Sequence, residues 1–185
     1  MTNLCGIKTV IIGDVGSGKS SIIKRLLFNK YNDFLDPTIG AQFFTKQIVH
    51  HNKLEIWDTS GQERYRSLIP MYLRNAVIVC IVISLDKSNE SIDNEKQYWL
   101  NYLQQHNTMS LDYKKILLYN KSDLNLDFVL HNDERFDFNC IVSCKTNIGI
   151  DQFHNSLESI LKNIEIPLLS EINSNRDRSK NCSLL

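Results

Sequence analysis

The sequence predicts an α/β fold in which helices cover both faces of a mostly parallel sheet. Short apolar runs rich in β-branched residues alternate with segments whose apolar residues recur every three or four positions. A glycine-rich loop, Gly13–Ser20, joins the first apolar run to the first helical segment. Polar clusters follow several of the runs. The carboxyl ends of parallel strands meet along one edge of a sheet, where ligands bind.

The expected strands are the short apolar runs. They lie at Thr9–Ile12, Phe43–Val49, Lys53–Trp57, Ala76–Ile83, Lys115–Tyr119 and Phe138–Val142. Only three residues separate the second run from the third, and a connection that short joins antiparallel strands. We therefore expect a six-stranded sheet with one antiparallel edge strand.

The expected helices carry apolar side chains along one face. They lie at Ser20–Phe28, Ser67–Leu73, Ser88–Gln105 and Ile150–Ile164, and Pro167 ends the last of them. The 185 residues suit one domain, which we expect at 1–166. The polar stretch at 167–185 is expected to be a flexible tail.

Composition excludes several classes of function. The formal net charge is zero, so no global field favours nucleic acid as a partner. The longest apolar run, Ala76–Ile83, is too short to span a bilayer. No signal segment is expected at the start, and Thr2 excludes N-myristoylation. The five cysteines show no metal-binding spacing and are interpreted as reduced cytosolic thiols.

The loop Gly13–Ser20 fits the phosphate-binding pattern G-x-x-x-x-G-K-[ST]. Glycines let the backbone N–H groups form a nest for anions, and the following helix adds unpaired N–H donors. Lys19 supplies a point charge, and the Ser20 hydroxyl can ligate Mg²⁺. The alternative is a glycine-rich turn with an ordinary surface lysine. Nucleotide contacts are expected from Val15, Gly16, Ser17, Gly18, Lys19, Ser20 and Ser21.

A second polar cluster, Asp58–Glu63, suits the same phosphates. Asp58 closes a strand and can hold Mg²⁺, unless it is simply a turn aspartate. Gly61 can offer its backbone N–H to a terminal phosphate at close range. The amide of Gln62 both donates and accepts, so it can orient a water for attack.

A third cluster, Asn120–Asp123, suits a purine base. The Asp123 carboxylate can accept two hydrogen bonds from adjacent N–H and NH₂ groups, which guanine has and adenine lacks. The stem of Lys121 can lie along the base plane. Tyr31 can cover the base or ribose, or it can be an ordinary surface tyrosine.

Together these residues resemble a Ras-superfamily small GTPase, over residues 6–163. The motifs that carry the resemblance are Gly13–Ser20, Thr38 in Pro37–Gly40, Asp58–Glu63, Asn120–Asp123 and Ser143–Lys145. Trp57–Tyr65 is similar to the Rab branch, and Ile39–Thr45 and Tyr65–Arg74 resemble its early-endosomal subgroup. The implied fold is the small G domain of the P-loop NTPases.

The resemblance implies a switch that binds GTP or GDP with Mg²⁺ and hydrolyses GTP. Thr38 would ligate Mg²⁺ with Ser20 and Asp58 and sense the γ-phosphate together with Gly61, while Gln62 would place the water. The implied base contacts are Asn120, Lys121, Asp123, Ser143, Cys144 and Lys145. The implied effector surface is Phe43, Trp57 and Tyr72.

The resemblance also implies partners and a location. The partners would be effectors, an exchange factor, a GTPase-activating protein, a prenyl-delivery protein and a GDP-dissociation inhibitor. No arginine occupies an evident in-chain finger position, so fast turnover would need the activating protein. The protein would regulate vesicle traffic on the cytoplasmic face of endosomal or other vesicle membranes and cycle with the cytosol.

The chain departs from the family pattern at several positions. Val15 stands where Rab proteins usually carry a small residue, and its stiff side chain predicts slow hydrolysis and a weak response to activating proteins. Ser60 and Cys144 replace alanines, which we expect to matter little. Only nineteen residues, 124–142, separate the Asn120–Asp123 motif from Ser143. The helix that the family usually has in this segment is therefore expected to be short or missing.

The C-terminal residues Cys182–Leu185 fit C-a-a-X and predict geranylgeranylation of Cys182. The alternative is an unmodified cysteine. Basic residues just before it are offset by acidic ones, so membrane attachment would be peripheral and reversible.

Two other functions are weighed against the GTPase. Another phosphate-loop enzyme, such as a nucleoside kinase or an ATPase, is disfavoured by Asn120–Asp123 and Ser143–Lys145. A nucleotide-binding scaffold with negligible hydrolysis is kept as the main alternative because of Val15.

Overall fold

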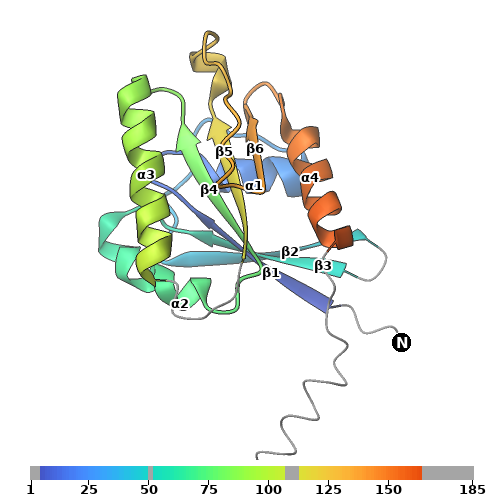
Figure 1. The fold of residues 1–185 in the computed structure, drawn as a ribbon. Coiled ribbons are helices and arrows are strands. Elements are labelled where there is room, and N and C mark those ends of the chain that lie inside the picture. Colours follow the sequence, from blue (N-terminus) through green and yellow to red (C-terminus); the bar gives the residue numbers. More distant parts are fainter. Residues whose placement is uncertain (1–4, 50–51, 107–112, 164–185) are drawn as a thin grey trace, which may run out of the picture.

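The computed structural model describes residues 5–49, 52–106 and 113–163 of the chain. Within these ranges six strands form one sheet (Figure 1). The strands are β1 (Cys5–Ile12), β2 (Ala41–Val49), β3 (Asn52–Thr59), β4 (Ile78–Ser84), β5 (Lys114–Asn120) and β6 (Phe138–Ile141). The helices are α1 (Lys19–Phe28), α2 (Ile69–Leu73), α3 (Asn89–His106) and α4 (Ile150–Asn163), with short 3-10 helices η1 (Glu63–Leu68) and η2 (Ser122–Leu124).

The strand order is β2-β3-β1-β4-β5-β6, with β1 between β3 and β4. Only the pair β2–β3 is antiparallel among these strands, and Phe43 lies opposite Trp57 in it. The neighbours β1–β3, β1–β4, β4–β5 and β5–β6 are all parallel. The predicted sheet, mostly parallel with one antiparallel edge strand, is confirmed.

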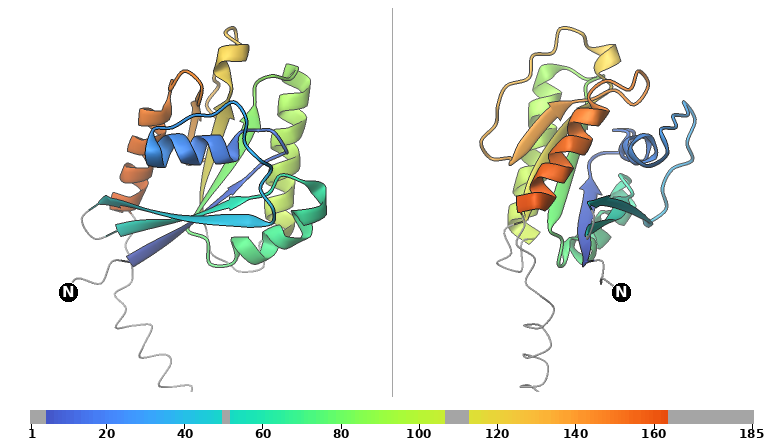
Figure 2. Two further views of the ribbon diagram at one scale, coloured as in Figure 1. Left: turned by 180° about the vertical axis from the view of Figure 1, so that it is seen from behind. Right: turned by 90° about the vertical axis from the view of Figure 1, so that its right-hand side faces the viewer.

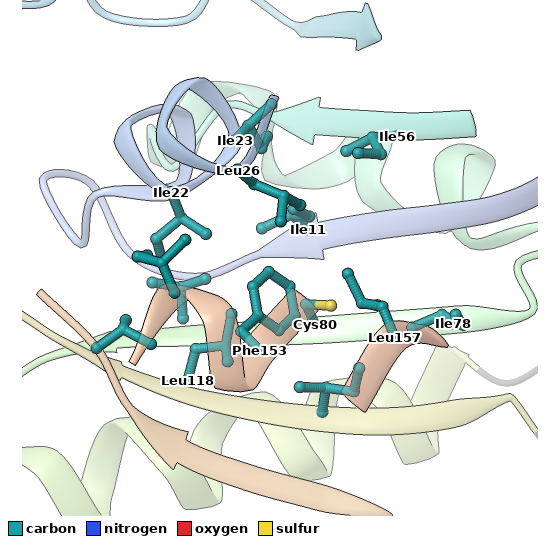
Figure 3. Packing of buried hydrophobic residues seen from close by; sticks show 14 of the residues in the cluster. Ile11, Ile22, Ile23, Leu26, Ile56, Ile78, Cys80, Leu118, Phe153 and Leu157 are labelled. Carbon is teal, nitrogen blue, oxygen red and sulfur yellow. The ribbon is translucent and has the colours of Figure 1, made fainter. Parts of the chain in front are cut away.

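Helices cover both faces of the sheet, with α1 and α4 on one face and α2 and α3 on the other (Figure 2). Alternate residues of β1 face the two layers: Ile11 belongs to the core under α1 and α4, and Val10 to the core under α2 and α3. Phe153 and Leu157 of α4 point toward the sheet in the first core (Figure 3). Burial on both faces explains why the central strands are continuous apolar runs.

Residues 125–137 form the irregular segment that was predicted in place of a helix. The Phe128 ring lies 4.9 Å from the ring of Tyr119. The Nη1 atom of Arg135 donates to Oε1 of Gln97 on α3 at 3.0 Å. These contacts hold the segment against the sheet and α3 although its backbone forms turns rather than a helix, so both flanking motifs keep their places.

The short helical segment predicted around Ser67–Leu73 is confirmed, and the structure divides it between the end of η1 and the five-residue helix α2. Pro70 lies in the first turn of α2, where its missing N–H costs nothing. The proposed domain boundary at 166, the tail and Cys182 lie outside the described residues. No helix in the described ranges is long and apolar enough to cross a bilayer.

Candidate functional site

A cavity of about 420 Å³ opens where the loops after β1, β3, β5 and β6 meet. The polar clusters that follow these strands therefore converge, as the sequence predicts. The predicted residues that line the cavity are Val15, Gly16, Gly18, Lys19, Ser20, Ser21, Tyr31, Thr38, Gly61, Gln62, Asn120, Lys121, Asp123, Cys144 and Lys145. Ser17, Asp58 and Ser143 lie behind this lining and are buried.

The phosphate loop turns tightly into α1 at Gly18. This residue has φ +92°, and a Cβ atom there would collide with the side-chain amide of Asn120, so only glycine fits. Gly18 is the N-cap of α1, and as a glycine it has no side chain with which to cap the helix. The first N–H groups of α1 are thus available at the cavity, and a helix N-terminus with open donors attracts anions.

Lys19 is a buried cation beside that helix start. Its Nζ donates to the carbonyl oxygens of Gly13 and Asp14, each at 2.8 Å, and only 6% of the residue is exposed. Burial lowers the pKa of Lys19 to about 8, although the carboxylates of Asp58, Asp14 and Glu95 oppose the shift. The ammonium is therefore mostly charged at neutral pH and would gain from an anion in the cavity.

Two hydroxyls and a carboxylate form a group of hard oxygen donors next to Lys19. Ser20 Oγ donates to Oδ2 of Asp58 at 2.6 Å and lies 3.0 Å from Oγ1 of Thr38. Burial raises the pKa of Asp58, and hydrogen bonds from Ser20 and Thr38 and the charge of Lys19 oppose the shift. The second oxygen, Oδ1, is buried without a hydrogen-bond partner among the described residues. A carboxylate oxygen left without a partner beside two hydroxyls fits Mg²⁺, which prefers oxygen ligands.

The loop after β3 lies directly against the phosphate loop. A Cβ atom on Gly61 would come within 2.6 Å of the carbonyl carbon and oxygen of Asp14 and 2.5 Å of the backbone nitrogen of Val15. The Val15 side chain is 57% exposed and lines the cavity. Gln62 also lines it, but its Oε1 accepts from Nε of Arg64 at 2.8 Å. The water-orienting role of Gln62 stays a prediction.

At the end of the cavity away from Lys19, hydrogen bonds join neighbouring loops. Asn120 is buried, and its Nδ2 donates to the carbonyl of Ser17 at 2.9 Å. The thiol of Cys144 donates to Oδ1 of Asn120 at 3.5 Å. Ser143 Oγ donates to Oδ1 of Asp123 at 2.6 Å, which fixes the carboxylate that the sequence assigns to a base. Neighbouring loops thus hold one another in place at this end.

Two residues near this end, Asp86 and Arg25, were not singled out from the sequence. Asp86 accepts from Nζ of Lys121 at 2.6 Å and anchors that ammonium. The guanidinium of Arg25 donates to the carbonyl of Cys144 at 2.8 and 2.6 Å. At the phosphate end, the Ser60 hydroxyl, which we expected to matter little, accepts the backbone N–H of Gln62 at 3.3 Å. Arg25 and Cys144 are 119 positions apart, and no sequence pattern connects them.

The three aromatic residues predicted as an effector surface lie side by side outside the cavity. The rings of Phe43 and Trp57 are 5.2 Å apart, and those of Trp57 and Tyr72 are 5.6 Å apart. Phe43 is half exposed. The structure brings the three together from β2, β3 and α2; their binding role stays a prediction.

The chain is similar to known GTPases. A model of the family described as Ras of Complex, Roc, domain of DAPkinase matches residues 8–123. The "Probable Rab-related GTPase" of Acanthamoeba polyphaga mimivirus is 37% identical over 187 residues, which cover 95% of this chain and 82% of that protein.

Two cellular relatives match over shorter stretches. The "Ras-related protein Rab5" of Nicotiana tabacum is 41% identical over 66% of this chain and 60% of its own length. The "Ras-related protein Rab-22A" of Mus musculus is 40% identical over 57% of this chain and 55% of its own length. The chain thus spans little more than half of these two relatives.

Proposed function

Because the chain belongs to the Rab family of Ras-like small GTPases, we propose that its cavity binds GTP and GDP with Mg²⁺ and hydrolyses GTP to GDP and phosphate. One observation carries this proposal. A single cavity has a buried cation with hard oxygen donors at one end and a fixed carboxylate, Asp123, at the other. A guanine nucleotide carries the matching groups at its two ends.

At the phosphate end, Lys19 would exchange its two backbone carbonyls for phosphate oxygens, since a charged acceptor makes the stronger hydrogen bond. The open N–H groups at the start of α1 would bind the same phosphates. Ser20, Thr38 and Asp58 would hold Mg²⁺, directly or through water, and the metal would neutralise charge on the phosphate oxygens.

At the base end, Asp123 would accept hydrogen bonds from the N–H and NH₂ groups of guanine. Adenine would leave the carboxylate unpaired, which is how a site rejects an analogue. The remaining residues of this end would hydrogen-bond between loops or contact the base through their backbone groups. They are Asn120, Ser143, Cys144 and Lys145.

Hydrolysis requires a water in line with the terminal phosphate. We assign its orientation to Gln62, whose side chain must first leave Arg64. Val15 would crowd this position, because its exposed side chain lines the cavity next to Gly61. Slow turnover without an activating protein follows.

The switch would act through the two loops that reach the terminal phosphate. Thr38 and Gly61 would contact this phosphate in the GTP state and relax after hydrolysis. The Phe43–Trp57–Tyr72 surface adjoins both loops and would present the state to effectors. Exchange factors, activating proteins, prenyl-delivery proteins and GDP-dissociation inhibitors are the other partners we propose.

We also propose that the protein works in vesicle traffic at endosomal membranes. The relatives named Rab5 and Rab-22A support this assignment. Lipid attachment at Cys182, which would make the protein a peripheral membrane protein, stays a prediction.

The first experiment measures the affinity of the full chain for GTP, GDP and ATP in the presence and absence of Mg²⁺. We expect both guanine nucleotides to bind much more tightly than ATP, with Mg²⁺ strengthening the binding. Equal or tighter binding of ATP would overturn the proposal.

A second candidate is a nucleotide-binding scaffold that hydrolyses negligibly, and the position of Val15 favours it. A single-turnover assay of GTP hydrolysis would compare the natural chain with Val15→Ser, with and without an activating domain. A faster rate in the variant supports a GTPase slowed by Val15. No phosphate release from either protein in any condition supports the scaffold, and equal measurable rates refute the role of Val15.

A further inference from the structure

Ser60 lies where the two proposed switch loops meet. Its backbone N–H donates to the carbonyl of Gly40 at 2.8 Å, which ties the end of β3 to the start of β2. Its side-chain Oγ accepts the backbone N–H of Gln62 at 3.3 Å. Only 3% of the residue is exposed, so water competes little for this hydroxyl.

Three consecutive residues are thereby fixed in different ways. The backbone of Ser60 is held by Gly40, and Gly61 is held by close packing against Asp14 and Val15. The N–H of Gln62 is held by the Ser60 hydroxyl. Any residue except proline could donate its backbone N–H to Gly40 from position 60, but holding the Gln62 N–H requires a side-chain acceptor there. An alanine would leave the Gln62 N–H without this partner.

The strand itself does not need the Ser60 hydroxyl. The preceding residue, Thr59, donates its own hydroxyl to the carbonyl of Ile11 at 2.6 Å and ties β3 to β1. The Ser60 hydroxyl is directed instead to the loop that follows the strand. Its effect is therefore expected on the position of Gln62 rather than on the stability of the sheet.

We propose that Ser60 is a positioning residue whose hydroxyl holds the Gly61–Gln62 backbone against the phosphate loop, so that this loop depends less on the terminal phosphate for its order. The inference rests on the proposed function. The loop would stay partly closed in the GDP state, and GTP would find the binding arrangement already populated. Pre-population of the competent state raises the apparent affinity for the ligand that selects it.

The test is the hydrogen-exchange rate of the Gln62 amide in the full chain, read by NMR, in Ser60→Ala against the natural protein. Loss of one partly buried hydrogen bond predicts about two- to tenfold faster exchange of this amide. The same variant should prefer GTP over GDP about two- to tenfold less than the natural chain does.

Ser156→Ala is the matched control, because Ser156 is also buried and its hydroxyl donates only to Phe153 within α4. It should leave both the exchange of the Gln62 amide and the GTP-to-GDP affinity ratio unchanged. Equal exchange of this amide in Ser60→Ala and the natural chain would overturn the inference, as would equal acceleration by Ser156→Ala. Both exchange outcomes can be read without nucleotide, so they are distinguishable from a failure to bind GTP, which refutes the proposed function instead.

Discussion

The two ends of the cavity are built differently. At the base end, protein groups already satisfy one another: Asn120 bonds to Ser17, Ser143 to Asp123, and Arg25 to the carbonyl of Cys144. The side chains of Asn120 and Ser143 are buried. The geometry of this end is therefore set by contacts within the protein and does not depend on a bound ligand.

At the phosphate end, the polar groups are either without partners or in contacts that a ligand could replace. Lys19 donates to backbone carbonyls, Oδ1 of Asp58 has no partner among the residues that the structure describes, and the side chain of Gln62 is held by Arg64. Val15 and Ile39 expose most of their apolar side chains. From this difference we propose that the interlocked loops recognise the nucleotide and that the loops with open contacts change state.

The largest effect is expected from removing the Asp123 carboxylate, which we propose binds the base. Asp123→Ala should weaken GTP binding about 10²- to 10⁴-fold, because two hydrogen bonds to a charged acceptor are lost. Discrimination against ATP should fall with it. Titration with fluorescent nucleotides measures both, and Asp127→Ala, on an exposed residue outside the cavity, is the control. A variant that keeps its guanine preference would move recognition away from this end.

A large effect of a different kind is expected at Lys19. Lys19→Met should weaken GTP about a hundredfold but leave guanosine binding unchanged, because only the phosphates lose a charged partner. The free energy of unfolding should change by less than about 1 kcal/mol, since relief of a buried charge offsets the lost hydrogen bonds. Calorimetry and thermal unfolding test the two parts, with Lys30→Met as the surface control. Equal weakening of GTP binding and guanosine binding would contradict the assignment of phosphate binding to Lys19 and of base binding to the other end of the cavity.

The pH dependence of GTP binding reports the same lysine. The pKa of Lys19 in the free protein is about 8, below its ordinary 10.5, and a bound phosphate favours the charged form and raises it. Above about pH 8 binding must therefore take up a proton, and affinity should fall by up to about tenfold per pH unit.

The contribution of Lys19 to folding stability changes with pH in the opposite direction to the affinity for GTP. Folding lowers the pKa of Lys19, so between about pH 8 and 10.5 the unfolded chain holds more protons, and the contribution of Lys19 to stability rises with pH. Isothermal titration from pH 7 to 9 measures the affinity, and Lys19→Met should flatten the profile. An unchanged slope in that variant would assign the titration to another group.

The smallest effect is expected from the frame of the base end. Ser143→Ala removes the hydrogen bond to Asp123 and the acceptor for the N–H of Thr146, so GTP should bind about two- to tenfold more weakly. In the Asp123→Ala background the same change should add little, because the group it positions is gone. Additive losses in the double variant would show that Ser143 acts independently of Asp123.

Much of the fold follows from the sequence because its signals are local. The central strands are continuous apolar runs, and α4 carries a clear apolar stripe, so both were predictable from periodicity. The short distance from Asn120–Asp123 to Ser143 likewise predicted the missing helix at 125–137. The segment from Glu63 to Leu73 was harder, because its 3-10 turn has no strong periodic pattern.

The gathering of site residues was also predictable, since strand ends in a parallel sheet share one edge. The hydrogen bonds that link these residues to one another were not predictable. Arg25 reaches Cys144 only because α1 and the loop after β6 become neighbours in the folded chain. The Ser60 hydroxyl was expected to matter little, yet it accepts a hydrogen bond from Gln62. Such contacts depend on loop conformation, which a residue pattern does not specify.

Hydrogen exchange of the full chain, loaded with GDP or with a non-hydrolysable GTP analogue, tests the contrast between the two ends most directly. We expect slower exchange with the GTP analogue at Thr38–Gly40 and Gly61–Leu68. At Asn120–Asp123 and Ser143–Lys145 the two states should exchange alike. Equal exchange everywhere, or a difference centred on the base end, would contradict the assignment of recognition to one end and switching to the other.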